Sequence, residues 1–527
     1  MNSIHVLDCT LRDGGYCNEW RFGHDNIIKI INGLIDAGVE IVECGFITNR
    51  VDNDLSITKY NSVNQITNML PRNHENKLFV AMMNYGEFDI DDLPPFDGSS
   101  IDGIRVAFHK KDYVDALKLC KKIIEKGYLV FVQAMVSLSY SDEEFLHIIR
   151  EVNRIKPYAF YIVDSFGMMK LKELTRLFYL VENNLDSNIW IGFHCHNNMQ
   201  LAYSNAQWLT NNHANRNLII DSSVYGMGRG AGNLNTELFI EYLNEQLGRN
   251  YRIKPILVLI DEIINSFYQK NYWGYSLSNY ISASHNAHPN YASFLEDKNT
   301  LTFEGMNAIF DMMSDDKKVS FDKEYIERLY LQYMASGKVL EEHMNELRDK
   351  INDKIALLVA PGKNAYDEAD RIKSLIVEKN VVVISVNFDY EVVSTDYIFV
   401  SNQRRFPELT ELAVSKSIVT SNISAKNAYF QTDYRDLLNK EESVFDNAGL
   451  MAIRFLILHG IKEIYLAGFD GYSHDALDNY VNSELTLVTK NSVLDAMNEG
   501  MIKVLSEYGK MVPLHFLTTT KYTAGLD

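Results

Sequence analysis

Short apolar runs alternate with amphipathic segments from residue 3 to about residue 235. The runs are rich in β-branched residues and have the length of strands, and the segments between them repeat apolar positions at helical spacing. Eight such strand-and-helix units predict an α/β fold, a closed (β/α)8 TIM barrel. The predicted strands are Ile4–Cys9, Glu40–Phe46, Leu78–Met83, Gly103–Phe108, Leu129–Met135, Phe160–Val163, Trp190–His196 and Leu218–Val224.

An open, doubly wound sheet is the structural alternative, because it also alternates strands with helices. Polar residues gather at the carboxyl ends of the predicted strands, where a barrel places its active site. This distribution favours closure of the sheet into a barrel.

The strand rhythm stops at about residue 236 and returns after about residue 350. Between these points the spacing predicts helices, among them Thr236–Leu247, Pro255–Tyr268 and Lys323–Ala335. We place a domain boundary inside the charged, helix-prone stretch 337–354. The predicted domains are a barrel over residues 1–235, a helical extension completing the active site over residues 236–350, and an α/β domain over residues 351–527.

The last third of the chain again alternates apolar runs with helical segments. This pattern predicts a Rossmann-like α/β domain with a mostly parallel sheet. Its predicted strands are Lys354–Val359, Val381–Val386, Tyr397–Val400, Glu463–Leu466 and Leu514–Thr518.

The composition excludes several classes of partner. With 46% hydrophobic and 23% charged residues, the chain is typical of a globular protein with sizeable cores. Its formal charge of -19 repels nucleic acid and anionic membranes, so a small molecule is the expected partner. No apolar run reaches the roughly 18 to 20 residues that span a bilayer, and no signal-peptide core opens the chain. We expect a cytoplasmic homo-oligomer.

The five cysteines form no CxxC pair, which indicates reduced thiols. Cys195 stands between His194 and His196, but strand alternation turns it to the opposite face. We therefore do not expect Cys195 to be a metal ligand.

Three candidate metal ligands converge on one end of the predicted barrel. Asp13 follows the first strand, and His194 and His196 end the seventh. Residues i and i+2 of a strand share a face, so both imidazoles can point at one ion. Two histidines and one carboxylate leave coordination positions open for substrate oxygens and water.

This ligand set suits carbon-carbon bond chemistry on a 2-oxo acid. Such an acid chelates a divalent ion, which stabilises the enolate formed when the neighbouring bond breaks or forms. Arg12 would add a second positive group over the developing oxyanion. The alternative for Arg12 is an ion pair with Asp13 or Glu43.

A glycine-rich segment, residues 226–233, follows the eighth predicted strand. It contains glycines at 226, 228, 230 and 232 and ends at Asn233. A dinucleotide fingerprint is one interpretation, but the segment ends the series of strands instead of opening a βαβ unit. A tight turn or lid beside the site is more economical, with Asn233 as a further ligand or a substrate contact.

Together these motifs resemble the metal-dependent lyase and aldolase superfamily that includes hydroxymethylglutaryl-CoA lyase, isopropylmalate synthase and 4-hydroxy-2-oxovalerate aldolase. The resemblance covers residues 4–235, and the 4-hydroxy-2-oxovalerate aldolases are the most similar branch. The matching motifs are Asp8-x-Thr10-Leu11-Arg12-Asp13-Gly14, Arg105-Val106-Ala107-Phe108-His109, Asp164-Ser165-x-Gly167, His194-x-His196-Asn197-Asn198 and the glycine-rich segment.

The resemblance implies a divalent ion, Mn2+ or Mg2+ with Co2+ or Zn2+ as alternatives, held by Asp13, His194 and His196. It also implies that Arg12 stabilises the enolate. The substrate-binding residues that we expect are Glu43, Arg105, His109, Ser165 and Asn233.

The proton carrier departs from the family pattern. The aldolases carry a histidine two residues after the Arg-Asp-Gly motif, where this chain has Tyr16. A tyrosine, with an ordinary pKa near about 10, is a poorer base at neutral pH. Tyr275 is the expected counterpart of a tyrosine that the family extension places near the substrate. His288 is either an ordered loop residue or a substitute acid/base.

The C-terminal domain carries a weaker motif. Residues 359–364 form a glycine turn after a strand, and helix N-termini of this kind bind phosphate. Residues 462–472 resemble a segment of DUF115-type and sialyltransferase-like nucleotide-binding domains. We expect a nucleotide or nucleotide-sugar site, with an inert docking domain as the alternative. The expected contacts are Gly362, Asn364, Asn387 and Asp470.

The sequence therefore predicts a carbon-carbon lyase, an aldolase that joins or splits pyruvate and an aldehyde, in the synthesis of surface glycans. The first alternative is a condensing synthase that uses an acyl-CoA. An acidic residue usual in the isopropylmalate branch is replaced here by Gly15, which counts against that alternative. The second alternative is a binding protein that has lost the enzymatic activity of its scaffold.

Overall fold

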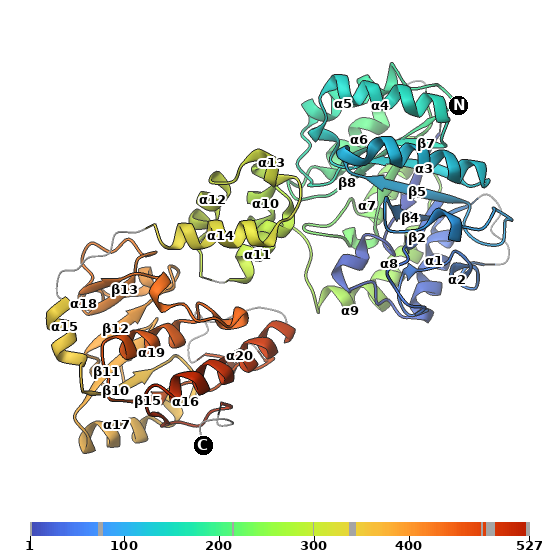
Figure 1. Ribbon diagram of the computed structural model, residues 1–527. Coiled ribbons are helices and arrows are strands. Elements are labelled where there is room, and N and C mark those ends of the chain that lie inside the picture. Colours follow the sequence, from blue (N-terminus) through green and yellow to red (C-terminus); the bar gives the residue numbers. More distant parts are fainter. Residues whose placement is uncertain are drawn as a thin grey trace. The chain divides into compact units, whose positions relative to one another are not determined.

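The computed structural model describes residues 3–71, 77–212, 216–298, 300–336, 344–475, 478–480 and 491–522. The chain folds into two compact units (Figure 1). The first comprises Met1–Ala292 and Ser314–Phe321, and the second comprises Ser293–Met313 and Asp322–Asp527. The helices predicted between residues 236 and 350 are divided between these units. Within the predicted boundary stretch, residues 337–343 lie outside the described part of the chain.

Eight parallel strands close into a barrel within the described residues of the first unit. Strand β1 pairs with both β2 and β9, so the sheet has no free edge there, and β3 is a short addition beside β2. The TIM-barrel prediction is confirmed and the open sheet is excluded. The strands are β1 (Ile4–Asp8), β2 (Ile41–Ile47), β3 (Lys59–Tyr60), β4 (Leu78–Asn84), β5 (Gly103–Phe108), β6 (Leu129–Ala134), β7 (Ala159–Asp164), β8 (Trp190–Cys195) and β9 (Leu218–Ser222).

Helices surround the strands of this unit in Figure 1. Helix α4 shows why they form: a capping box between Ser141 and Glu144 begins it, and its apolar stripe is buried. The helices are α1 (His24–Ala37), α2 (Asn64–Thr67), α3 (Tyr113–Glu125), α4 (Asp142–Ile155), α5 (Leu171–Glu182), α6 (Ala202–Asn212), α7 (Thr236–Leu247), α8 (Ile253–Leu259), α9 (Asn265–Tyr268), α10 (Leu277–Ser284), α11 (Pro289–Asp297, which continues into the second unit) and α13 (Asp315–Lys318).

Two apolar layers stabilise the barrel. One fills its interior and includes Leu7, Phe131 and Tyr161. The other lies between strands and helices and includes Cys195. Strand alternation therefore turns Cys195 away from the interior, as predicted, and all five cysteines are present as thiols.

The second unit contains a parallel sheet, and its first strand in the sequence, β10, lies in the interior of the sheet. Strands β11 to β14 follow on one side of β10, and β15 and β16 lie on the other. This confirms an α/β domain; the sequence prediction missed β13 and β14. The strands are β10 (Ile355–Val359), β11 (Val381–Val386), β12 (Tyr397–Val400), β13 (Ser417–Thr420), β14 (Phe430–Thr432), β15 (Glu463–Ala467) and β16 (Leu514–Phe516).

Helices pack against this sheet through apolar residues. Ile372 and Leu375 of α17 join a core with Leu357 and Val359 of β10, while α19 packs against β11 and β12. The helices of the second unit are α12 (Phe303–Asp311), α14 (Lys323–Met334), α15 (Met344–Ile351), α16 (Asn364–Asp367), α17 (Ala369–Glu378), α18 (Glu411–Ser415), α19 (Ala448–Leu458) and α20 (Asn491–Gly509).

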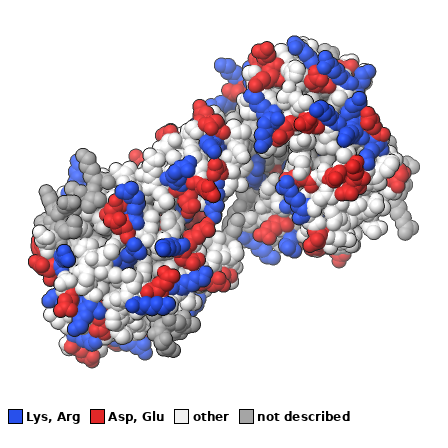
Figure 2. All heavy atoms as spheres, in the orientation of Figure 1, with Lys and Arg blue, Asp and Glu red and all other residues white. Residues whose placement is uncertain are grey.

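Positive and negative side chains are interspersed on the face of the molecule in Figure 2. A patch of a single sign, which nucleic acid would require, is not visible on that face. Among the described residues, no helix combines the length and the apolar character needed to cross a lipid bilayer.

Candidate active site at the mouth of the barrel

The three predicted metal ligands meet at the carboxyl ends of the strands. Asp13 lies in the turn after β1, His194 lies in β8, and His196 follows β8 directly. One potential ligand atom from each side chain lies within 4.8 Å of the others. All three residues are buried, with at most 5% of their surface exposed. The structure therefore brings together a site able to hold a metal ion, as the spacing predicted.

Asp221 of β9 orients the first of the two histidines. Its Oδ2 atom lies 3.0 Å from Nδ1 of His194, which leaves Nε2 of this ring available to an ion. Carboxylates in this position fix the tautomer and the orientation of metal-binding histidines. No sequence pattern pointed to Asp221, because a single acidic residue inside an apolar strand produces no periodic signal.

The second histidine, His196, lies beside the carboxylate ligand Asp13. Nδ1 of His196 is buried, accepts or donates no hydrogen bond among the described residues, and lies 3.7 Å from Oδ2 of Asp13. Burial lowers the pKa of His196 to about 3, so the ring is neutral near pH 7. A neutral imidazole with an unshared nitrogen is a suitable metal ligand.

Asp13 is held in its ionised form. Burial by itself raises the pKa of this carboxyl, but the positive charge of Arg12 and interactions with the site histidines outweigh burial and hold the pKa well below its usual range. Nδ2 of Asn233 donates a hydrogen bond of 2.8 Å to Oδ2 of Asp13. Asn233 therefore lies within the site, where it orients the carboxylate.

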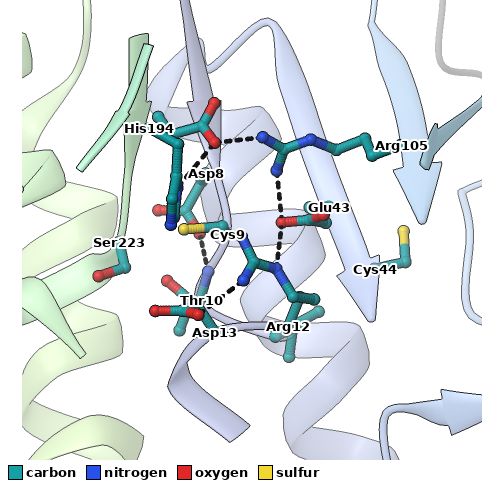
Figure 3. A network of polar contacts seen from close by, with 12 residues as sticks. Asp8, Cys9, Thr10, Arg12, Asp13, Glu43, Cys44, Arg105, His194 and Ser223 are labelled. Atoms are coloured by element: carbon teal, nitrogen blue, oxygen red, sulfur yellow. Dashed lines mark hydrogen bonds and ion pairs between the residues drawn. The ribbon is translucent and has the colours of Figure 1, made fainter. Parts of the chain in front are cut away.

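A chain of buried ion pairs links strands β2, β5 and β9 with the turn after β1 (Figure 3). Oε2 of Glu43 accepts hydrogen bonds from Nε of Arg12 at 2.9 Å and from Nη1 of Arg105 at 2.7 Å. Arg12 also donates to Oδ1 of Asp13 at 2.6 Å, and Arg105 pairs with Asp221. Glu43 thus holds two guanidinium groups in place, and direct contact of Glu43 or Arg105 with substrate stays a prediction.

Arg12 combines the two roles that its sequence context suggested. It forms ion pairs with Asp13 and with Glu43, yet its Nη2 atom is buried without a hydrogen-bond partner among the described residues. A buried donor of this kind is costly unless a ligand satisfies it. The ion pairs therefore hold Arg12 in place and leave its buried Nη2 group without a described partner beside Asp13.

The glycine-rich segment closes over the metal ligands. A side chain at position 228 could not fit, because its Cβ would lie 2.3 Å from Nδ2 of Asn233 and 2.8 Å from Oδ2 of Asp13. The carbonyl oxygen of Gly228 accepts a hydrogen bond from the thiol of Cys17 at 3.2 Å. The segment is therefore a tight turn beside the site, as the more economical interpretation predicted.

Arg229 is a further site residue that the sequence analysis passed over. Its guanidinium group donates to the carbonyl of Ser165 at 3.2 Å and lies 5.4 Å from the ring centre of Tyr16. Its Nε atom is buried without a partner among the described residues. The only sequence signal was a cation inside the glycine-rich segment.

His288 from the helical extension reaches the same region. Its ring centre lies 5.6 Å from that of Phe166, which follows β7. Burial, and then the charge of Arg229, lower the pKa of His288 to about 3. Nδ1 of His288 accepts a hydrogen bond from the backbone of Asn290 at 3.2 Å, which places the ring proton on Nε2.

The remaining predicted site residues differ in their surroundings. Tyr16 is 42% exposed and packs its ring against Trp20, with the ring centres 4.7 Å apart. Tyr275 is 56% exposed, and its hydroxyl makes no hydrogen bond with a described residue. His109 is exposed, and Ser165 accepts a hydrogen bond from the backbone of Val136 at 2.9 Å. Substrate contacts by these residues stay predictions.

In the second unit, the predicted nucleotide contacts lie at the carboxyl edge of the sheet. Gly362 and Asn364 follow β10, Asn387 follows β11, and Asp470 follows β15. The backbone N–H of Asn364 already donates to Oδ2 of Asp470 at 2.8 Å. The turn that was predicted to offer this N–H group to a phosphate is therefore occupied by a carboxylate of the chain itself.

Several known proteins are similar in sequence to the part of the chain that contains the barrel. The 4-hydroxy-2-oxovalerate aldolase of Pseudoalteromonas translucida (strain TAC 125) is 26% identical over 243 residues, 46% of this chain and 70% of that protein. The enzyme of the same name from Geobacillus genomosp. 3 is 26% identical over 246 residues, 46% of this chain and 71% of that protein. The N-terminal domain of a candidate aldolase from Bacteroides vulgatus is 27% identical, with a TM-score of 0.48, covering 57% of this chain and 98% of that one. The HMGL-like family model matches residues 3–258, and this part of the chain is therefore an HMGL-like domain.

Proposed function

We propose that the first unit is a divalent-metal-dependent aldolase that makes or cleaves the bond between the enolate of pyruvate and an aldehyde. The observation that carries this proposal is the convergence of Asp13, His194 and His196 with the unpartnered Nη2 atom of Arg12. The relatives named 4-hydroxy-2-oxovalerate aldolase support the reaction class.

The ligand set fits Mn2+ or Mg2+, with Co2+ or Zn2+ as alternatives. Two imidazoles and one carboxylate form an open set, and Asp221 and Asn233 hold a ligand residue each. When bound, a divalent ion supplies a positive charge that polarises a keto oxygen and stabilises an enolate.

Arg12 stabilises the developing negative charge from a fixed position. Glu43 and Asp13 each accept one of its hydrogen bonds, so the guanidinium group does not reorganise when charge develops on the substrate. Preorganised donors of this kind commonly give the largest single contribution to catalysis. The free Nη2–H group is the donor that we assign to the substrate oxyanion.

His288 is the stronger candidate for the proton carrier. Its neutral ring presents an Nε2–H group, whereas Tyr16 lies half exposed at the edge of the site. A negative charge on a bound ligand would raise the pKa of His288 from about 3 toward neutral pH. We therefore assign the proton transfer to His288.

The packing around Gly15 favours the aldolase over the condensing synthase. A Cβ atom at this position would lie 2.1 Å from Cδ1 of Trp20. Trp20 is fixed because its Nε1–H donates to the carbonyl of Arg12 at 2.8 Å. The acidic side chain expected of the isopropylmalate branch therefore has no space here. A role in surface-glycan synthesis remains part of the proposal and rests on the sequence of the second unit.

Exchange of pyruvate methyl protons for deuterium tests the proposal directly, since enolate formation releases one methyl proton. We expect exchange in deuterium oxide with Mg2+, followed by NMR, and a loss of about a hundredfold or more in Asp13→Ala. Asp115→Ala, which removes an exposed carboxylate of α3, is the matched control. A protein that binds the ion but exchanges no pyruvate protons would reject the aldolase; exchange of acetyl-CoA instead would favour the synthase.

A further inference from the structure

The second unit contains a cavity of about 720 Å³ that the aldolase proposal does not use. All of its lining residues belong to this unit. Four of the segments that line it follow β10, β11, β12 and β15, at the carboxyl edge of the sheet drawn in Figure 1. The strand order reverses between β10 and β15, and open parallel sheets bind ligands in the crevice at such a point.

Asp470 lines this cavity and has one hydrogen-bond acceptor without a described partner. Its Oδ2 atom accepts from the backbone of Asn364, while its Oδ1 atom is buried without a hydrogen-bond partner among the described residues. The carboxylate also occupies the turn after β10, so a phosphate is not expected there. A ligand that donates hydrogen bonds, such as the hydroxyl groups of a sugar, would satisfy Oδ1.

Asn387 lies on the neighbouring strand end and adds an amide. Its backbone is left-handed, with φ at 63°, and its Oδ1 atom accepts from the backbone of Ser401 at 3.1 Å. This contact fixes the side-chain amide so that Nδ2 remains a donor on the cavity wall. A fixed acceptor and a fixed donor at adjacent strand ends are suited to a polyhydroxylated ring.

Lys298 supplies the cation of the cavity. Its Nζ atom lies 4.0 Å from the ring centre of Phe445, and burial lowers its pKa. It forms no ion pair with a carboxylate in the described part of the chain, whereas Lys323 pairs with Glu442 and Lys503 lies 3.5 Å from Glu441. Asp446, Glu327 and Glu442 attract this cation from beyond ion-pair distance, so its Nζ atom is still open to a phosphate.

The charge balance of the lining limits how anionic the ligand can be. Six carboxylate residues and four cationic residues line the cavity, so a polyphosphate would meet net repulsion. A single phosphate needs only one cation, and Lys298 is not held in an ion pair with any described carboxylate. Phe445, Phe469 and Met497 add apolar wall, and the volume exceeds what one sugar ring fills.

We propose that this cavity binds a nucleoside monophosphate, with ribose hydroxyls at Asp470 and Asn387, the phosphate at Lys298 and the base on the apolar wall. A nucleoside monophosphate and a free sugar phosphate share a hydroxylated ring that carries one phosphate. The size of the cavity favours the nucleotide. The proposal concerns the second unit and does not depend on the aldolase chemistry of the first.

Isothermal titration calorimetry of the full chain tests this assignment with CMP, UMP, AMP and GMP. We expect saturable binding of at least one of them, weakened at least tenfold in Asp470→Asn and in Lys298→Met. The amide oxygen introduced by Asp470→Asn could still accept from the Asn364 backbone, so the exchange removes only the free acceptor. Asp478→Asn and Lys373→Met change exposed residues outside the cavity lining and should bind within twofold of the unaltered chain.

Comparison ligands separate the sources of the phosphate. Binding of ribose 5-phosphate as tight as that of the best nucleotide would overturn the nucleotide assignment in favour of a free sugar phosphate. Equal binding of the phosphate-free nucleoside would overturn the role of Lys298. The proposal also fails if none of the four nucleotides binds at millimolar concentration, or if both variants bind like the unaltered chain. Asp13→Ala should bind the nucleotide normally.

Discussion

The barrel mouth and the cavity of the second unit differ in how their polar side chains are paired. Both place polar side chains at the carboxyl ends of parallel strands. In the mouth, Arg12, Glu43 and Arg105 are almost fully buried and pair with one another. In the cavity, within the described part of the chain, Lys298 forms no ion pair and one oxygen of Asp470 accepts no hydrogen bond. In the mouth, the charged groups of the chain pair with one another. In the cavity, a cation and a hydrogen-bond acceptor are still open to a ligand.

This difference has a thermodynamic consequence. A buried charge is tolerated only with a partner, and removing one partner of a buried pair costs far more than removing one from an exposed pair. Substitutions in the mouth should therefore affect stability as well as activity. Substitutions in the cavity should affect ligand binding first.

The largest effect should follow removal of the carboxylate shared by two arginines. We expect Glu43→Gln to lower the free energy of unfolding by about 3 to 5 kcal/mol, because two buried guanidinium groups lose their common anion. Urea unfolding followed by circular dichroism measures this change. Glu346→Gln, which breaks an exposed pair with Lys350 in the second unit, should cost less than about 0.5 kcal/mol. Similar costs in both variants would remove the distinction between the two regions.

His288 tests whether a mouth residue without an ion pair still matters. Among the described residues it is held by hydrogen bonds and ring contacts alone. We expect His288→Gln to slow the metal-dependent exchange of pyruvate protons about a hundredfold, with little change in stability. The pH dependence of exchange should also lose its acidic limb. Tyr16→Phe should retain most of the activity. A large loss in Tyr16→Phe together with a small loss in His288→Gln would instead identify Tyr16 as the proton carrier.

Asp221→Asn should weaken metal binding without removing a ligand. The amide can still accept a hydrogen bond from His194, but it no longer carries the charge that favours the correct tautomer and pairs with Arg105. We expect a tenfold to hundredfold loss of Mn2+ affinity by calorimetry. Unchanged affinity would show that β8 alone positions the histidine.

Asp8 should produce the smallest change, visible as a pH dependence of stability. Burial raises its pKa from 3.8 to about 6, although Thr10 and Thr236 donate to it. Because the folded pKa lies above the unfolded one, the stabilising contribution is full below about pH 4 and is lost as the pH rises through 6. Relative to Asp8→Asn, the unaltered chain should lose about 2 kcal/mol between pH 4.5 and 7.5.

Urea titrations at both pH values measure this difference. Asp164, whose pKa burial also raises to about 6, is present in both proteins and cancels in the comparison. A difference that is the same at both pH values would contradict the prediction.

The sequence was most informative where one local pattern determined the structure. Strand β5 has the predicted bounds because every residue from Gly103 to Phe108 is buried and all of them except Arg105 are glycine or apolar. Strands β13 and β14 were missed because they are only four and three residues long and carry polar residues. Short strands take their pairing from neighbours that are distant in the sequence.

The same distinction holds for the site. The spacing of His194 and His196 identified a shared strand face, and Asp13 followed from its place after the first strand. Asp221 and Arg229 were missed because their importance comes from contacts across the barrel, which no local period encodes. His288 could be suspected from its residue type alone, but only the fold shows that it reaches Phe166.

The thiol that contacts the glycine-rich turn has a practical consequence for spectroscopy. Cys9, Cys44, Cys120 and Cys195 are buried, whereas Cys17 is partly exposed and donates to the carbonyl of Gly228. A maleimide fluorophore or a nitroxide spin label should therefore attach to the native protein at Cys17 alone. The unmodified sequence thus carries a reporter position next to the turn beside the metal ligands, and the surroundings of that turn can be compared with and without substrate without engineering a cysteine.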